Sequence, residues 1–220
     1  MIIPRTDDSS LPRIGDAIKG GGVIAFRTDT FYGLGADPFN RSAVQRIKDL
    51  KGREEHKPIL VLISTQDQFT RFISERSPVF DLLAEKFWPG PLTLIGRAAD
   101  SLPEDLTAGT KTVGVRLPDD DRVRTLVQAC GGALTATSAN PAHQRPAKTA
   151  ADVDKYFGDG VDLIIDDGES KTDRPSTVID ATSNRAVLIR EGVIAWNEIQ
   201  AELQAFPISS NVGSSPSGRG

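Results

Sequence analysis

The sequence has 220 residues and a mass of 23.6 kDa, enough for one sizeable domain. Its 38% hydrophobic and 25% charged residues are typical of a globular protein and exclude a disordered chain. The net charge of −4 argues against general nucleic-acid binding. The single cysteine, Cys130, excludes an intrachain disulfide and favours a reducing compartment. Because no apolar run is long enough to span a bilayer, we expect a cytoplasmic protein without a membrane partner.

Helix and strand patterns alternate along the chain. Apolar residues spaced along one face predict a helix over residues 11–18, and a short apolar run at 23–26 predicts a buried strand. Further helices are predicted after Asn40 up to residue 50 and over 79–87, 123–127, 153–157 and 199–203. Further strands are predicted over 59–63, 92–95, 113–117, 133–136, 163–165, 178–179 and 187–189. This order predicts one α/β domain over residues 1–206, with a twisted, mixed sheet flanked by helices, and a disordered Ser/Gly/Pro-rich tail over 207–220.

Polar residues directly follow the predicted strand at 23–26. The segment 27–35 holds two threonines, a tyrosine and two glycines, and we interpret it as a loop. Ligands in α/β proteins bind where strands end, and glycine lets a backbone approach a ligand closely. The alternative is an ordinary turn whose Thr and Asp side chains bind their own backbone.

Four cations gather before the predicted strand at 59–63, namely Lys48, Lys51, Arg53 and Lys57. Over residues 41–57 the chain carries six cations and three acidic residues, so this stretch is basic within an acidic chain. Several cations on one short segment suit a chain of phosphates. The alternative is that they complement the negative end of a helix dipole.

Arg116 lies inside an otherwise apolar predicted strand, which is costly unless the guanidinium is paired. Facing a cleft, it would bind a carboxylate. Alternatively it pairs with one of the aspartates at 119–121. Small and polar residues at 136–141 follow the next predicted strand and offer uncharged hydrogen bonds to a ligand.

Taken in order, these segments resemble the YrdC family of threonylcarbamoyl-AMP synthases. The resemblance covers about residues 10–200 and is carried by eight short motifs, at residues 28–34, 51–53, 57–58, 87–93, 116–118, 137–140, 176–178 and 190–192. It implies a single YrdC-like α/β domain with a large, concave, positively charged cleft.

The resemblance also implies an activity. Members of the family join L-threonine, bicarbonate and ATP into threonylcarbamoyl-AMP and pyrophosphate, for threonylcarbamoyl-adenosine modification of tRNA position 37. It implies magnesium carried by ATP, with no metal held by protein side chains. A threonylcarbamoyl transferase complex would act downstream, and direct contact with tRNA or double-stranded RNA is left open.

Residue roles follow from the same resemblance. Lys51 and Arg53 are the expected catalytic residues. The expected threonine-binding positions are Thr30, Tyr32, Arg116, Ala136 and Ser176. The expected ATP-binding positions are Arg53, Lys57, Ser138, Asn140, Pro146 and Arg190.

Two positions depart from the family pattern. Leu62 replaces a histidine associated with threonine binding, and Arg27 replaces a proline before the Thr-Asp-Thr segment, adding a charge near the site. Two other functions are weighed. A hydrogenase-maturation carbamoyltransferase would need zinc-finger and acylphosphatase modules for which this chain has no room. An RNA-binding paralogue without synthase activity would not need Lys51, Arg53, Ser138, Asn140 and Arg190 together.

Overall fold

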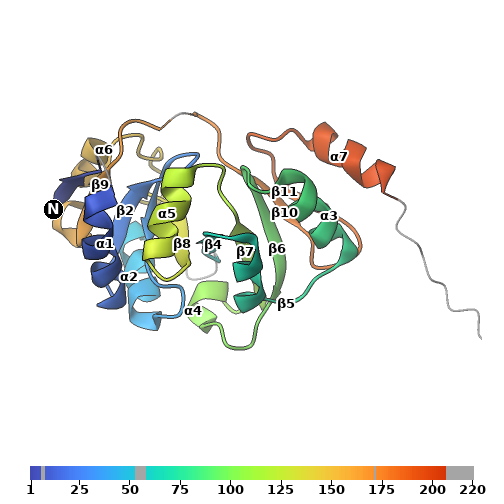
Figure 1. Cartoon of the computed structure of the whole chain (residues 1–220), viewed down its shortest axis with the longest axis horizontal. Helices are drawn as coiled ribbons and strands as arrows, with labels where there is room; N and C mark the ends of the chain where they lie inside the picture. The colour runs from blue at the N-terminus through green and yellow to red at the C-terminus, as the bar shows by residue number, and fades with distance from the viewer. Residues whose placement is uncertain (6–7, 53–57, 171, 207–220) are drawn as a thin grey trace, which may run out of the picture.

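Most helices and strands follow one another in the predicted order (Figure 1). The computed structural model describes residues 1–5, 8–52, 58–170 and 172–206. The predicted tail at 207–220 lies outside these residues, as do Arg53 and Lys57.

The described residues form the following elements. The strands are β1 (Ile2–Pro4), β2 (Ile24–Arg27), β3 (Tyr32–Gly35), β4 (Leu60–Ile63), β5 (Ile73–Glu75), β6 (Leu92–Ala98), β7 (Thr112–Arg116), β8 (Ala133–Ser138), β9 (Leu163–Asp166), β10 (Thr177–Asp180) and β11 (Val187–Arg190). The α-helices are α1 (Leu11–Lys19), α2 (Arg41–Lys51), α3 (Pro78–Phe87), α4 (Glu104–Thr107), α5 (Asp121–Ala129), α6 (Ala150–Phe157) and α7 (Trp196–Ala205).

Side-chain caps set where the helices begin and end. Asn40 accepts a hydrogen bond from the Ala43 amide and starts α2, and Asp120 does the same for α5 with the amides of Arg122 and Val123. Helix α2 stops at Gly52, whose φ of 56° is left-handed and suits glycine. These caps place the ends of α2 and α5 beside the central strands.

All eleven strands belong to one mixed sheet, which confirms the predicted fold class. Its order is β1-β9-β2-β3-β8-β4-β7-β6-β10-β11, with β5 paired to β6. The β4–β7 and β6–β10 pairs are parallel, whereas β3–β8, β4–β8 and β6–β7 are antiparallel.

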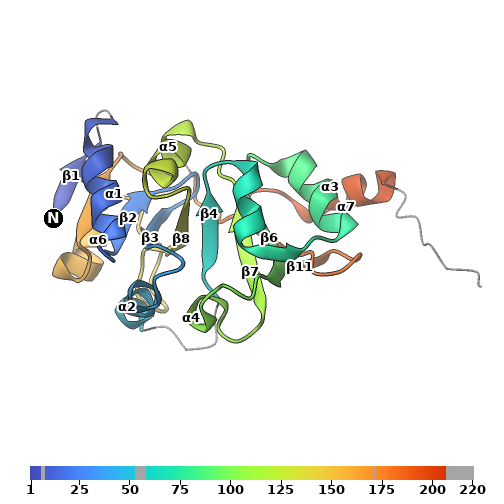
Figure 2. The same cartoon turned by 60° about the horizontal axis from the view of Figure 1, so that its bottom comes forward.

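Two apolar clusters cover the two faces of the sheet. The larger packs α2, α3, α4, α6 and α7 against one face, and the smaller packs α1 and α5 against the other. Figure 2 shows α1 and α5 above the sheet, with α2 and α4 below it. Because only two of the described helices cover the second face, its central strands are left to line a pocket.

The interpretation of residues 27–35 as a loop is wrong in its second half. Tyr32–Gly35 is strand β3, antiparallel to β2 and to β8, and only residues 28–31 form a turn. Gly35 serves packing, since a Cβ there would lie 2.7 Å from the Phe26 ring. The short strands β1 and β5 and the one-turn helix α4 carry too few residues for a periodic pattern.

Candidate active site

A pocket of about 520 Å³ opens on the sheet face that α1 and α5 leave uncovered. Alternate residues of neighbouring strands form its floor, because side chains one residue apart point to opposite faces. Register places Leu60 of β4 opposite Ala136 of β8, and Gly114 of β7 opposite Ile95 of β6. Gly114 has no side chain to project into the pocket, and a Cβ there would lie 3.1 Å from the Thr93 side chain.

Arg116, at the end of β7, forms one wall of the pocket. Its Nη2 lies 3.1 Å from Oδ1 of Asp29, and the two side chains are 3% and 8% exposed. The alternative that Arg116 pairs with an aspartate is therefore confirmed, with Asp29 as the partner in place of the examples at 119–121. The β2–β3 turn folds Asp29 back onto the guanidinium, with Nη1 of Arg116 3.5 Å from Oγ1 of Thr30. Burial raises the pKa of Asp29, against the opposing effect of Arg116.

The turn itself is held by its own side chains, as the alternative interpretation expects. Oγ1 of Thr28 donates to the Phe31 carbonyl at 2.7 Å and accepts from the Thr30 amide at 3.1 Å. Thr28, Thr30 and Phe31 nevertheless line the pocket, so the turn is both self-bonded and part of the site.

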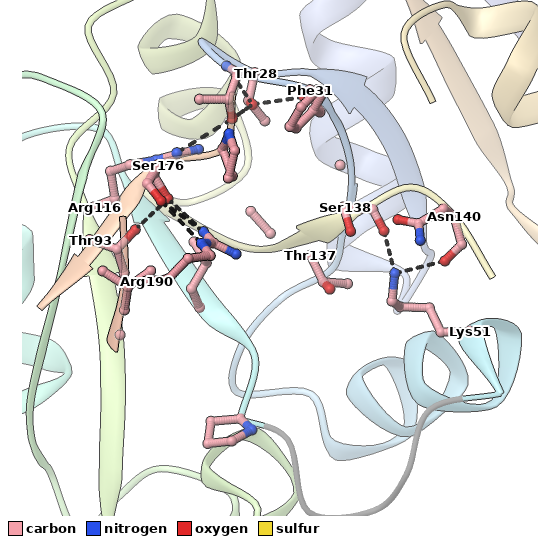
Figure 3. Close-up of a pocket in the computed structure, with 18 of the residues that line it drawn as sticks. Thr28, Phe31, Lys51, Thr93, Arg116, Thr137, Ser138, Asn140, Ser176 and Arg190 are labelled. Atoms are coloured by element: carbon pink, nitrogen blue, oxygen red, sulfur yellow. Dashed lines mark hydrogen bonds between the residues drawn. The ribbon is translucent and has the colours of Figure 1, made fainter. Parts of the chain in front are cut away.

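Ser176 and Arg190 meet on the same wall, as Figure 3 shows. The Arg190 guanidinium donates to the Ser176 carbonyl at 2.9 and 3.2 Å and to its Oγ at 3.2 Å. Oγ of Ser176 also lies 3.0 Å from Oγ1 of Thr93. Burial, and then the charge of Arg116, lowers the pKa of Arg190. The structure therefore brings two cations together on one wall, where an anion would relieve their repulsion.

The end of β8 and the segment that follows it form the opposite wall, with Ser138 and Asn140 at the pocket (Figure 3). The Asn140 side-chain amide donates to the carbonyls of Pro141 and Gln144 at 2.9 and 2.8 Å, so it shapes this segment. Nζ of Lys51, at the end of α2, donates to the main-chain carbonyls of Ser138 and Asn140.

Three other predicted residues take different places. Ala136 is on the pocket floor. Tyr32 borders the pocket, but its ring belongs to the larger core and its hydroxyl donates to the Gly168 carbonyl at 2.8 Å. Burial accordingly raises the pKa of Tyr32 to about 12. Pro146 lines a neighbouring pocket that shares Phe31 with the main one.

The two residues that depart from the family pattern, Arg27 and Leu62, are both buried. Arg27 is 5% exposed and pairs with Asp120 and Asp167 at 3.1 and 3.2 Å, so its charge is balanced. Arg27 adds a charge next to Thr28 of the pocket, and the two carboxylates pair with that charge. Leu62 is fully buried in the smaller core, opposite Arg116 in the β4–β7 register.

Thr93 and Asp29 are site residues to which sequence analysis gave no role. Both lie inside quoted motifs, at residues 87–93 and 28–34, so the motifs marked them without indicating what they touch. Within the described residues, no group of three or more His, Cys, Asp or Glu side chains could hold a metal ion. No helix in the described part of the chain is long and apolar enough to cross a membrane.

The fold and this pocket define an α/β protein with a cationic, ligand-sized site on an open sheet face. A family profile with the description "Telomere recombination" (Sua5_yciO_yrdC) matches residues 16–192. The chain belongs to this Sua5/YciO/YrdC family.

Relatives named threonylcarbamoyl-AMP synthase match most of the chain. A threonylcarbamoyl-AMP synthase of Thiobacillus denitrificans is 36% identical over 185 residues, which cover 84% of this chain and 98% of that protein. A threonylcarbamoyl-AMP synthase of Pyrococcus abyssi is 36% identical over 183 residues, covering 83% of this chain. The matched region spans 54% of the Pyrococcus protein, about half of its length.

A solved structure of the Pyrococcus abyssi relative has the same fold as this chain. The crystal structure of P. abyssi Sua5 complexed with L-threonine superposes with a TM-score of 0.88 at 33% identity. The match covers 92% of this chain and 61% of that one.

Proposed function

We propose that this chain is a threonylcarbamoyl-AMP synthase that forms threonylcarbamoyl-AMP and pyrophosphate from L-threonine, bicarbonate and ATP. The observation that carries the proposal is a pocket with the buried Arg116 on one wall and the polar residues Ser138 and Asn140 on the other. Similarity to curated synthases and to a threonine-bound relative supports it.

In this proposal Arg116 binds the threonine carboxylate. Asp29 occupies Nη2, and Nη1 lies beside Thr30 at the pocket, so the guanidinium has one edge directed to a ligand. The Ser176 hydroxyl and the backbone near Ala136 complete the threonine subsite.

The triphosphate lies across the same pocket. Ser138, Asn140 and Arg190 contribute from the two walls, with Pro146 at the neighbouring pocket. Arg53 and Lys57 lie outside the described residues, and their roles as phosphate ligands stay predictions from the resemblance. Magnesium would accompany ATP on its phosphate oxygens and supply charge neutralisation there.

The chemistry needs a neutral amine. Bicarbonate releases hydroxide to give carbon dioxide, whose carbon the threonine nitrogen attacks. The amine proton combines with the hydroxide as water, which leaves a carbamate. A carbamate oxygen then attacks the α-phosphorus of ATP as the bond to pyrophosphate breaks. Arg116 and Arg190 favour the uncharged amine, since nearby cations lower an amine pKa. The protein therefore acts mainly through position and charge.

The product's destination is part of the proposal. Threonylcarbamoyl-AMP is a mixed anhydride, so a transferase that accepts its threonylcarbamoyl group must act next, on adenosine 37 of tRNA. Bicarbonate use, tRNA contact and a cytoplasmic location stay predictions.

The test is threonine-dependent release of pyrophosphate from ATP in the presence of labelled bicarbonate, with recovery of label in threonylcarbamoyl-AMP. Controls omit threonine or replace it with D-threonine. Pyrophosphate release equal to the blank, together with retained RNA binding, would exclude the synthase and favour the RNA-binding paralogue.

A further inference from the structure

Lys51 holds the wall segment that carries Ser138 and Asn140 (Figure 3). Its Nζ donates to the Ser138 carbonyl and, at 2.8 Å, to the Asn140 carbonyl. The Lys51 carbonyl accepts from the Ala142 amide at 2.8 Å. One residue thus bonds three positions of the segment through both its side chain and its backbone.

The ammonium is suited to this task. Two carbonyl oxygens that converge on one point repel each other, and a cation with three donors satisfies both. Lys51 is 6% exposed and is the last residue of α2, where the negative end of the helix dipole stabilises a buried cation. Removing the ammonium would take its donor from both carbonyls and leave the Ser138 carbonyl with the Asn140 amide, which donates to it at 2.9 Å.

The far side of the segment is fixed separately. The Ala139 amide donates to the Tyr32 carbonyl at 2.8 Å, and the Ala147 amide donates to the Ala139 carbonyl at 3.1 Å. The segment is therefore tied to β3 on one side and to α2 on the other. Lys51 supplies the α2 side.

We propose that Lys51 is a positioning residue, which preorganises the Ser138–Asn140 wall for the triphosphate through its bonds to the two carbonyls. This assigns Lys51 a different role from the catalytic contact that the sequence suggested, and it rests on the proposed function for the identity of the ligand. A preorganised wall binds its ligand more tightly because less ordering is needed at binding.

Lys51→Met is the test, with Lys48→Met as its matched control. Lys48 lies one turn earlier on α2 and is 7% exposed, so the same change is made at an equally buried site. Hydrogen exchange of a peptide over residues 138–147 is measured first, because it needs no activity. The dissociation constant for ATP alone is measured next, without threonine or bicarbonate.

In Lys51→Met we expect exchange in this peptide to be about tenfold faster, with other peptides unchanged. ATP affinity should fall about tenfold and the threonine KM stay within about twofold. Lys48→Met should leave the 138–147 exchange at its wild-type rate. Wild-type exchange with lost activity would overturn the proposal, since Lys51 would then act by direct contact with substrate.

Two further outcomes are decisive. Faster exchange throughout the protein, equal in both variants, would also overturn the proposal, because Lys51 would then be a general core residue. If Lys51→Met does not fold, Lys51→Ala replaces it, since the smaller side chain removes the donors without placing apolar atoms against the two carbonyls. Faster exchange confined to 138–147 then supports the proposal, and unchanged exchange contradicts it. Absence of product from the wild-type enzyme would refute the synthase but leave the exchange result standing.

Discussion

Arg116 and Asp29 form a buried ion pair, with Nη2 and Oδ1 3.1 Å apart, directly behind the predicted threonine subsite. The pair links the end of β7 to the β2–β3 turn. It fixes one edge of the guanidinium and leaves the other beside Thr30 and the pocket.

Substitution of Arg116 should therefore affect threonine more than ATP. In Arg116→Lys the planar fork is lost but the charge is kept, and we expect the threonine KM to rise about tenfold or more. The ATP KM should change by less than about twofold. Steady-state kinetics with each substrate varied in turn measures this. Equal effects on both KM values would show that Arg116 does not bind the threonine carboxylate.

Removal of Asp29 should instead cost stability. Asp29→Asn leaves the buried guanidinium without its counter-ion, and we expect the free energy of unfolding to fall by about 3 kcal/mol. Saturating L-threonine should recover part of this loss, because its carboxylate supplies the missing negative charge. Urea denaturation with and without threonine tests both parts. An unchanged unfolding midpoint would mean that the pair contributes nothing to stability.

Thr93 should tune threonine binding through Ser176. In Thr93→Val the 3.0 Å contact with the Ser176 hydroxyl is lost at nearly constant volume. We expect a several-fold higher threonine KM and a stability loss of about 1 kcal/mol. Thr135→Val is the control, since Thr135 is equally buried and accepts from the Ala36 amide, away from the pocket. It should lose similar stability with an unchanged threonine KM; a raised KM in the control would refute the specific role.

Asp152 predicts a pH dependence of stability. Hydrogen bonds from the backbone amide of Lys148, and from Thr149, lower the pKa of this carboxyl below its usual 3.8. A depressed pKa stabilises the folded state above pH 3.8, and this contribution is lost as pH falls through the folded-state pKa.

Asp152→Asn should accordingly lower the unfolding free energy at about pH 7 by about 0.5 kcal/mol, because water screens this largely exposed carboxylate. The difference in unfolding free energy between this variant and the wild type should become smaller in acid, as Asp152 becomes protonated. Denaturation at several pH values measures it, with Asp154→Asn, exposed on the same helix, as the control. A gap that stays constant with pH would contradict the assigned role of the carboxylate.

Cys130 should be inert in the folded protein. Burial raises the pKa of its thiol to about 12, so almost no thiolate is present near neutral pH. Iodoacetamide labelling followed by mass spectrometry should be slow in native buffer and fast in denaturant, where the same cysteine serves as its own control. Rapid native labelling would show that Cys130 is accessible.

Local sequence information determined most of the elements. The 3.6-residue spacing in α1 and the Asn40 cap of α2 act between near neighbours, so they could be predicted. Motif resemblance likewise placed Thr30, Arg116, Ser138, Ser176 and Arg190 around one pocket. The resemblance was less informative for Tyr32, an expected threonine-binding residue, because its hydroxyl donates to the Gly168 carbonyl.

Only the tertiary structure decided which atoms each site residue contacts. The polar residues and glycines of 27–35 predict a loop that approaches a ligand, whereas residues 32–35 form strand β3 and its Gly35 packs closely against Phe26. Asp29 pairs with Arg116 across 87 positions of sequence, and Lys51 reaches carbonyls more than 80 residues away. Such contacts depend on strand order and register, which no local pattern encodes. The sequence therefore determined which residue types the site holds, and the fold decided which atoms they touch.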